Sequence, residues 1–417
     1  MKIIIVAENA SECFGGEAII PLHYFRLLTQ RGHDVWLVTH SRVRSELEKT
    51  LSPELLRYVH FMPDTWMHKL LFYVGEWLPH RLNVMTVEAI MFLISELFVR
   101  KYIRQKIVDE DVDVVHQPYP VASKRPTMIY DVGVPVVIGP MNGDMNFPSG
   151  FTDMESRFEQ FFVRLLRYSS DFANRVIPGK KRAAALIVAN QRTMNALPVC
   201  SSSHVYVMSE NGVNISCQDK LSKNKSDRIS AHPEFVYLGR LIDWKNVETL
   251  IQALAIVLTK TDAYLTIIGD GTERNKIESI VAETGLEEHV HFLGFLPQAE
   301  ALPRLRKSIA LLLPSLYECG GAVVLEAMAN ETPVIATNWG GPSDYLNEKS
   351  GILIHPESEE QMINDFAKAM LSLIENPELC RSMGQEGRKI VERDFSWEKK
   401  IDMIESIYQE AIDNHVG

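Results

Sequence analysis

The chain has 417 residues, of which 46% are apolar and 23% charged, so it has an ordinary globular composition and room for two domains. Its formal net charge is −11, with the acidic excess in the second half, and a nucleic-acid-binding protein would instead show a basic face with an aromatic platform. Its five cysteines are scattered and form no CxxC pair, which excludes a disulfide framework and a zinc cluster. We therefore expect a reduced, cytoplasmic protein that does not bind nucleic acid.

The apolar runs are short. The opening sequence MKIIIVAENA has only a brief apolar run before Glu8, which is too short for a signal peptide. No segment reaches the roughly 18–20 uncharged apolar residues that a membrane span needs. The sequence therefore predicts a chain without a transmembrane helix.

Strand and helix patterns alternate along the whole chain, which predicts parallel sheets with crossover helices, an α/β fold. The strands expected in the first half are Lys2–Ala7, Val35–Thr39, Val112–His116, Val134–Ile138, Ala185–Ala189 and Val205–Met208. Those expected in the second half are Phe235–Gly239, Tyr264–Ile268, Val290–Leu293, Ala310–Leu313, Pro333–Ala336 and Gly351–Ile354. We expect two doubly wound, Rossmann-like domains, 1–208 and 209–394, followed by a helix in 395–417. A polar stretch at 217–230 suits a linker or surface loop next to their boundary.

The first half holds two candidate binding positions. Gly15 and Gly16 follow the first strand and open a helix, where backbone amides can approach a phosphate or an acceptor; a simple tight turn explains them nearly as well. His116 ends its strand at the carboxyl edge of the sheet, where open α/β sheets bind ligands. A lone histidine is more often structural, but this position favours a site.

Residues 66–106 are rich in large apolar side chains, in WMHKLLFYVGEWLP and VEAIMFLISELFVRKYI. A buried helix pair is the default interpretation. The alternative is a peripheral membrane contact, in which basic side chains face anionic headgroups: Arg100, Lys101, Arg104 and Lys106.

The segment FVYLGRLIDWK places two cations, Arg240 and Lys245, in the loop after a strand of the second half. Fixed cations there can stabilise the negative charge that develops on a departing diphosphate without a metal. A solvated surface loop is the alternative.

The most informative segment is Ala310–Ala329, ALLLPSLYECGGAVVLEAMA. A buried strand is followed by Glu318, the glycines Gly320 and Gly321, and a helix that carries Glu326 about one turn from its start. The exposed amides and positive dipole end of such a helix bind phosphate. A carboxylate near this end can accept hydrogen bonds from a ribose diol, so the pattern suits a sugar diphosphate.

The spacing Glu–x7–Glu with LEAMA, PVIAT and GGP resembles the donor-sugar signature of the retaining GT-B glycosyltransferases of family 4 (glycosyl transferases group 1). The resemblance implies two Rossmann-like domains facing a cleft, with the C-terminal helix crossing back to the first. It assigns catalytic roles to His116, Glu318, Arg240 and Lys245. It assigns donor binding to Gly15, Gly16, Asn211, Gly212, Phe295, Leu296, Gly320, Gly321, Ala322, Val323 and Glu326.

The chain departs from this signature in two places. It has Cys319–Gly320–Gly321–Ala322 where the family usually has Gly–Phe–Gly–Leu, and Glu331 where a glycine is usual. We expect the smaller residues at 320 and 322 to affect which donor sugar fits. Asp111 and Asp113 form a DxD pattern, but they precede their strand, whereas metal-binding transferases carry the pattern after it. We therefore predict no metal requirement and no cofactor.

The leading hypothesis is a metal-independent, retaining hexosyltransferase. It moves a sugar from a nucleoside diphosphate, with UDP favoured over a GDP-mannose donor, to a hydroxyl of a saccharide or lipid-linked acceptor on the first domain. The alternatives are a nucleotide-sugar epimerase or phosphorylase, a hydrolase that uses Glu318 and Glu326, and a non-catalytic nucleotide-sugar-binding protein. The cations at 240 and 245 have no role in the hydrolase scheme.

Overall fold

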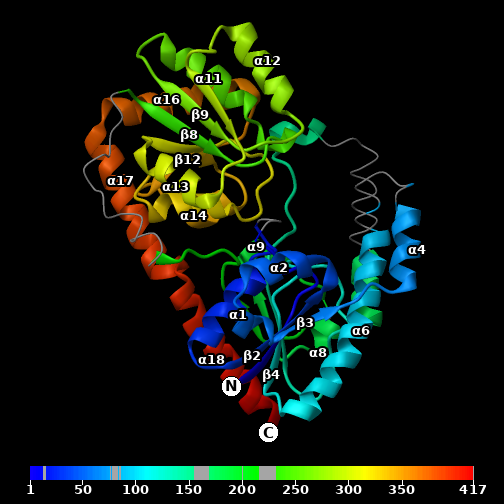
Figure 1. The fold of residues 1–417 in the computed structure, drawn as a ribbon. Coiled ribbons are helices and arrows are strands. Elements are labelled where there is room, and N and C mark those ends of the chain that lie inside the picture. Colours follow the sequence, from blue (N-terminus) through cyan, green and yellow to red (C-terminus); the bar gives the residue numbers. More distant parts are fainter. Residues whose placement is uncertain are drawn as a thin grey trace. The chain divides into compact units, whose positions relative to one another are not determined.

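A computed structural model describes residues 1–12, 16–75, 77, 83, 86–154, 169–199, 201–215 and 232–416 (Figure 1). The chain forms two compact units. The first unit contains residues 1–144, 157–210 and 400–417, and the second contains 145–156 and 211–399. The C-terminal segment from Lys400 onward is therefore part of the first unit, and a short piece of the first half is part of the second.

The first unit is built on a parallel sheet with seven strands among the described residues, in the order β3-β2-β1-β4-β5-β6-β7. The strands are β1 (Lys2–Val6), β2 (Asp34–His40), β3 (Val59–Met62), β4 (Val114–Gln117), β5 (Val136–Met141), β6 (Ala185–Val188) and β7 (Val205–Val207). Most are short apolar runs buried on both faces, as expected of a parallel sheet covered by helices.

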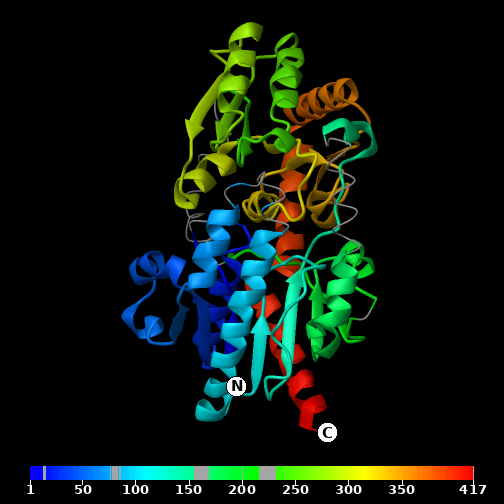
Figure 2. The same ribbon diagram turned by 90° about the vertical axis from the view of Figure 1, so that its right-hand side faces the viewer.

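Helices cover this sheet from both sides, with α1 and α18 on one side and α6 on the other (Figure 1). A proline in the first turn starts α1, and a left-handed Asp111 ends α6. In the quarter-turned view, α18 again runs beside the sheet (Figure 2). The helices are α1 (Ile20–Gln30), α2 (Arg44–Thr50), α3 (Pro53–Leu56), α4 (Trp66–Gly75), α6 (Val87–Glu110), α8 (Gly179–Arg182), α9 (Gln191–Asn195) and α18 (Trp397–Val416). The first residues of α18 belong to the second unit. A short 3-10 turn, η1 (Ser41–Val43), precedes α2.

The second unit contains a parallel sheet whose described strands run in the order β10-β9-β8-β11-β12-β13. They are β8 (Glu234–Leu238), β9 (Tyr264–Ile268), β10 (Val290–Gly294), β11 (Ala310–Leu313), β12 (Val334–Thr337) and β13 (Gly351–Ile354). The helices are α11 (Glu248–Leu258), α12 (Arg274–Thr284), α13 (Gln298–Lys307), α14 (Ala322–Ala329), α15 (Gly341–Tyr345), α16 (Glu359–Glu375) and α17 (Pro377–Ile390). Short helical turns are η2 (Ser149–Met154), η3 (Asp243–Lys245) and η4 (Val391–Phe395). One continuous apolar core joins the sheet to these helices.

Both strand orders reverse direction once, between β1 and β4 in the first unit and between β8 and β11 in the second. In such sheets, ligands bind beyond the carboxyl ends of the two strands at the reversal. The predicted α/β class, with two doubly wound parallel sheets, is confirmed. No helix among the described residues is long and apolar enough to span a bilayer.

Candidate active site

Two predicted site residues of the second unit meet at its strand-order reversal. Lys245 lies at the end of η3 in the loop after β8, and Glu318 lies in the loop after β11. The Lys245 ammonium forms a salt bridge with the Glu318 carboxylate, and the two side chains are only 12% and 15% exposed. The sequence predicted both residues but not that they pair.

Glycines fix the loop that carries Glu318. Gly321 adopts a left-handed φ of +75° immediately before α14. The Gly341 amide donates to the Glu318 carbonyl at 2.7 Å. A Cβ on Gly341 would lie 1.9 Å from the Gly320 carbonyl oxygen, and one on Gly340 would lie 2.3 Å from the Glu318 carbonyl oxygen. The Gly–Gly–Pro segment is therefore packed directly against the glutamate loop.

Glu326 lies in α14, and one of its carboxylate oxygens, Oε1, accepts a hydrogen bond from Gln298 Nε2 at 2.7 Å. Burial raises the pKa of Glu326, and the hydrogen bond from Gln298 lowers it. Gln298 opens α13 and was not predicted as a site residue, because no motif in the sequence surrounds it. Ala322 and Val323 form the first turn of α14, where amides have no partner inside the helix.

The side chain of Arg240 is exposed, but its backbone is held tightly. The Tyr237 hydroxyl donates to the Arg240 carbonyl at 2.8 Å. The Gly–Asp–Gly turn after β9 packs against the same loop, since a Cβ on Gly269 would lie 1.9 Å from the Gly239 carbonyl oxygen. The turn therefore shapes the Arg240 loop.

The remaining donor-binding candidates of the second unit lie in different surroundings. Phe295 is 80% exposed directly after β10, and Leu296 packs against the core. Asn211 is buried and donates from its amide to the Tyr345 hydroxyl at 3.1 Å, and Gly212 follows it in the chain. Asn211 therefore connects to α15, and Phe295 presents an open aromatic face.

His116, in the first unit, is completely buried. Its Nε2 donates to the Gly139 carbonyl at 2.6 Å, and its Nδ1 accepts from the Tyr408 hydroxyl at 2.6 Å. The edge of the Tyr24 ring lies against it, with ring centroids 4.8 Å apart. Burial lowers the pKa of His116 to about 4, so the ring is neutral at pH 7. Nδ1 thus ties α18 to the sheet, and Nε2 connects β4 to β5. A catalytic role for His116 stays a prediction.

The other candidate residues of the first unit have fewer contacts that indicate a binding role. Gly15 lies outside the described residues, and Gly16 has a φ of +29° with no atom within 4 Å of an added Cβ. Asp113 accepts a hydrogen bond from the Lys2 amide at 2.7 Å, so it secures the amino ends of β4 and β1. The described residues contain no cluster of three or more histidine, cysteine or acidic side chains suited to a metal.

Sequence reasoning missed a buried polar group beside α18. The Glu210 carboxylate accepts from Asn142 Nδ2 at 2.8 Å, and Lys400 donates to the Ser209 carbonyl. Burial lowers the pKa of Lys400 to about 7, although Glu210 raises it. Glu210 was not among the predicted site residues. Its partner Lys400 lies far along the chain, and no local pattern connects the two.

Solved structures share this two-unit architecture. A glycosyltransferase from Rickettsia africae superimposes with a TM-score of 0.68 at 17% identity, covering 99% of each chain. Anabaena Alr3699/HepE, solved in complex with UDP, superimposes with a TM-score of 0.64 at 15% identity, covering 100% of each chain. The chain therefore has the GT-B fold.

Residues 218–390 match the family described as glycosyl transferases group 1. The chain is 33% identical over 177 residues to N-acetyl-alpha-D-glucosaminyl L-malate synthase of Bacillus anthracis, covering 42% of this chain and 45% of that protein. It is 33% identical over 179 residues to an uncharacterized glycosyltransferase, MJ1178, of Methanocaldococcus jannaschii, covering 43% and 48%. The chain thus matches less than half the length of these relatives, and residues 218–390 are the part that matches the glycosyl transferases group 1 family.

Replacing Gly341 with alanine tests how the Gly340–Gly341 segment packs against the loop that carries Glu318. We expect Gly341→Ala to lower the free energy of unfolding by about 3 kcal/mol, because the new Cβ overlaps the Gly320 carbonyl oxygen. Hydrogen exchange should also become faster in 318–341. The matched control is Gly285→Ala, a left-handed glycine with no atom within 4 Å of its Cβ, which should leave exchange in 318–341 unchanged. Equal exchange in Gly341→Ala and the unsubstituted protein would contradict this packing argument.

Proposed function

We propose that the protein is a retaining, metal-independent hexosyltransferase of family 4. It moves a sugar from a nucleoside-diphosphate sugar, with UDP favoured and GDP-mannose second, to a hydroxyl of a saccharide or lipid-linked acceptor. The observation that carries the proposal is the Lys245–Glu318 pair at the strand-order reversal of a group 1 domain. The UDP complex of a protein with the same fold supports the choice of donor base.

The proposed reaction requires groups that stabilise the negative charge of the departing diphosphate. The bond between the sugar anomeric carbon and the diphosphate oxygen breaks, and the diphosphate leaves with the electron pair. A bond from the acceptor oxygen forms on the same face of the sugar, and the acceptor proton passes to the departing phosphate. Lys245 and Arg240 supply positive charge for the diphosphate, and the first amides of α14 supply hydrogen-bond donors.

Two glutamates are suited to the polyol parts of the donor. Glu318 is oriented by Lys245 and by the backbone contact of Gly341, and we assign it to the transferred sugar. We assign Glu326 to the ribose, because Gln298 uses only one of its two carboxylate oxygens. The exposed ring of Phe295 is assigned to the nucleoside base, together with Leu296.

The same site suits the alternatives unequally. A nucleotide-sugar epimerase, a phosphorylase and a non-catalytic nucleotide-sugar-binding protein use the same diphosphate contacts, and product analysis with donor alone separates the epimerase because it needs no acceptor. A hydrolase that uses Glu318 and Glu326 is disfavoured, because it leaves the cations Arg240 and Lys245 without a role.

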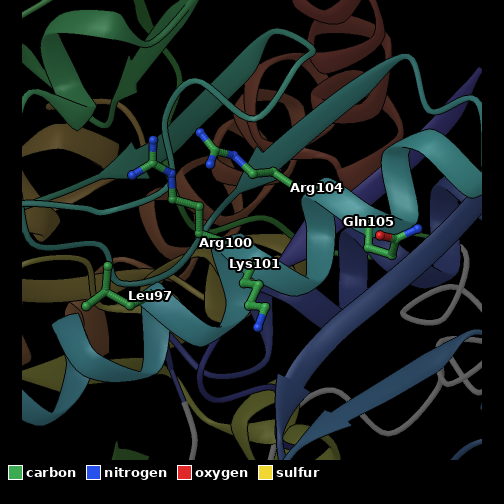
Figure 3. A pocket seen from close by; sticks show the side chains of 5 residues that line it. All are labelled: Leu97, Arg100, Lys101, Arg104 and Gln105. Carbon is green, nitrogen blue, oxygen red and sulfur yellow. The ribbon is translucent and has the colours of Figure 1, made fainter.

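We also propose a cytoplasmic location with peripheral contact to the membrane through residues 66–106. In α4 and just after it, four aromatic side chains are exposed: Trp66 (72%), Phe72 (57%), Tyr73 (65%) and Trp77 (89%). A hollow of about 370 Å³ on α6 is lined by Leu97, Arg100, Lys101, Arg104 and Gln105. In Figure 3, Arg100 and Arg104 extend in one direction and Lys101 extends away from them. Exposed aromatic rings on α4, with the exposed cations Lys101 and Arg104 on α6, suit the interface of an anionic bilayer.

The cation assignment is tested by Arg240→Ala and Lys245→Ala. A thermal-shift screen of nucleoside-diphosphate sugars first identifies the donor, because binding raises stability by mass action. With that donor, each substitution should lower the rate of nucleoside-diphosphate release about 100-fold or more while the protein stays folded. Lys260→Ala, which removes an exposed lysine elsewhere in the unit, should have no effect. Near-normal turnover in both site variants would refute the assignment.

The metal assignment is tested with a chelator. We expect turnover to be the same with and without an excess of EDTA, because Lys245 and Arg240 supply the positive charge at the diphosphate. Loss of turnover in EDTA that added Mg²⁺ restores would count against this role for the cations.

The membrane assignment is tested by sedimentation with phosphatidylglycerol/phosphatidylcholine vesicles at low salt. The unsubstituted protein should sediment, and the double substitution Trp66→Ser/Phe72→Ser should reduce the bound fraction about tenfold, because two exposed rings are lost from the interface. Val199→Ser, at a valine of the same unit that is 92% exposed, is the control. An unsubstituted protein that stays in the supernatant at low salt would rule out the contact.

A further inference from the structure

The loop after β10 brings one polar side chain to Glu326, the residue assigned above to the ribose. Gly294 ends β10 with a left-handed φ of +66°, and Gln298 begins α13. The carbonyl of Pro297 accepts from the Ala301 amide at 3.0 Å, so Gln298 is held in the first turn of this helix.

Gln298 fixes one half of the Glu326 carboxylate, because its Nε2 donates to Oε1 at 2.7 Å. An ionised carboxylate only accepts hydrogen bonds, so the amide presents its N–H and not its oxygen to Glu326. Glu326 Oε2 and Gln298 Oε1 make no hydrogen bond with a described residue. Glu326 is partly buried and Gln298 is exposed, so a ligand can reach the pair from solvent.

The same hydrogen bond favours the charged form of Glu326. Burial raises the pKa of Glu326, and the hydrogen bond from Gln298 lowers it. A protonated carboxyl uses one oxygen as a donor and loses part of its capacity to accept. Gln298 therefore supports the form of Glu326 that can accept from two hydroxyls at once.

A ribose offers two neighbouring hydroxyls, and each can donate one hydrogen bond. Oε2 of Glu326 is open to one hydroxyl, and Oε1 keeps a second lone pair while Gln298 holds it. A carboxylate fixed in this way needs no reorientation when the ribose binds, and a ligand with its two groups in the right place gains affinity from that. A sugar without these hydroxyls gains nothing from the arrangement.

The packing of α13 on α14 does not depend on this hydrogen bond. Leu302 and Leu305 of α13 are buried in the same apolar core as Leu325 and Met328 of α14. The Gln298 side chain lies at the exposed edge of this contact, where a single hydrogen bond contributes little to the stability of the fold. A role in binding therefore explains the pair better than a role in packing.

We propose that Gln298 is a positioning residue for the donor, and that it holds the Glu326 carboxylate so that Glu326 accepts the ribose hydroxyls. The inference rests on the proposed transferase function and on the assignment of Glu326 to the ribose. Gln298 acts through Glu326 and takes no part in bond breaking. It determines how strongly the site prefers a ribose to a sugar that lacks the diol.

The test compares nucleoside diphosphates with their 2′,3′-dideoxy forms by calorimetry on the whole protein. UDP, GDP and ADP are measured first, and the one that binds most tightly is paired with its dideoxy form. The unsubstituted protein should bind the ribose form about 100-fold more tightly, because the dideoxy form leaves the carboxylate without its two donors. The ratio of the two affinities is the quantity that the variants should change.

Gln298→Leu keeps a side chain of similar size and removes the N–H donor. It should lower the ratio about tenfold, with the affinity for the dideoxy form changed less than threefold, which also shows that the variant is folded. Gln298→Lys keeps an N–H donor and should retain the ratio within about threefold. Gln385→Leu, at an exposed glutamine of α17 in the same unit, is the matched control and should leave the ratio unchanged.

An unchanged ratio in Gln298→Leu, or an equal loss of affinity for both forms, would overturn this inference. So would an equal fall of the ratio in Gln298→Lys and Gln298→Leu, because the N–H donor would then have no special role. In each case, binding of the nucleoside diphosphate to the unsubstituted protein leaves the proposed function intact. No binding of UDP, GDP or ADP to the unsubstituted protein would instead overturn the proposed function together with this inference.

Discussion

The candidate donor site depends on the contact between two backbone segments, 318–320 and 340–341. Neither Gly340 nor Gly341 can carry a side chain without overlapping a carbonyl of the glutamate loop. The contact lets the Gly341 amide hold the Glu318 carbonyl, and Lys245 then reaches the Glu318 carboxylate from the loop after β8. Three loops that follow neighbouring strands are thereby joined, so the position of the glutamate is set by backbone packing before any ligand arrives.

The proposed donor site would bind an anion on a chain that is acidic as a whole. The formal net charge of −11 describes the long-range field, whereas binding of a diphosphate depends on the groups within a few ångströms. Lys245 is held near the site by Glu318, and Arg240 is exposed on a loop that Tyr237 and the Gly–Asp–Gly turn keep in place. In the proposed function, Arg240 and the start of α14 supply local positive charge in a negatively charged unit, and Lys245 contributes while it is paired with Glu318.

The sequence predicted most strands because each is a short, continuous apolar run between turn residues. It missed β3, Val59–Met62, whose side chains are all only partly buried and include a histidine. It also placed the whole stretch before residue 208 in one domain, whereas 145–156 belongs to the second unit, where the Trp339 indole donates to the Asn146 carbonyl. Motifs identified Glu318, Glu326 and Lys245 as candidates. The pairs Lys245–Glu318 and Gln298–Glu326 join residues that are 73 and 28 positions apart in the chain. Local sequence patterns carry no information about such long-range pairs.

The two histidines at the carboxyl ends of β4 and β2 show why position alone does not identify a binding residue. His116 ends a predicted strand in the place where ligands bind, yet Gly139 and Tyr408 occupy both of its nitrogens, and Tyr408 lies 292 residues away. His40 also ends its strand, and its buried Nε2 lies 3.3 Å from the Asp64 carboxylate without hydrogen-bond geometry. Buried polar groups in folded proteins are almost always satisfied, so the contacts of a strand-end side chain decide its role more than its position does.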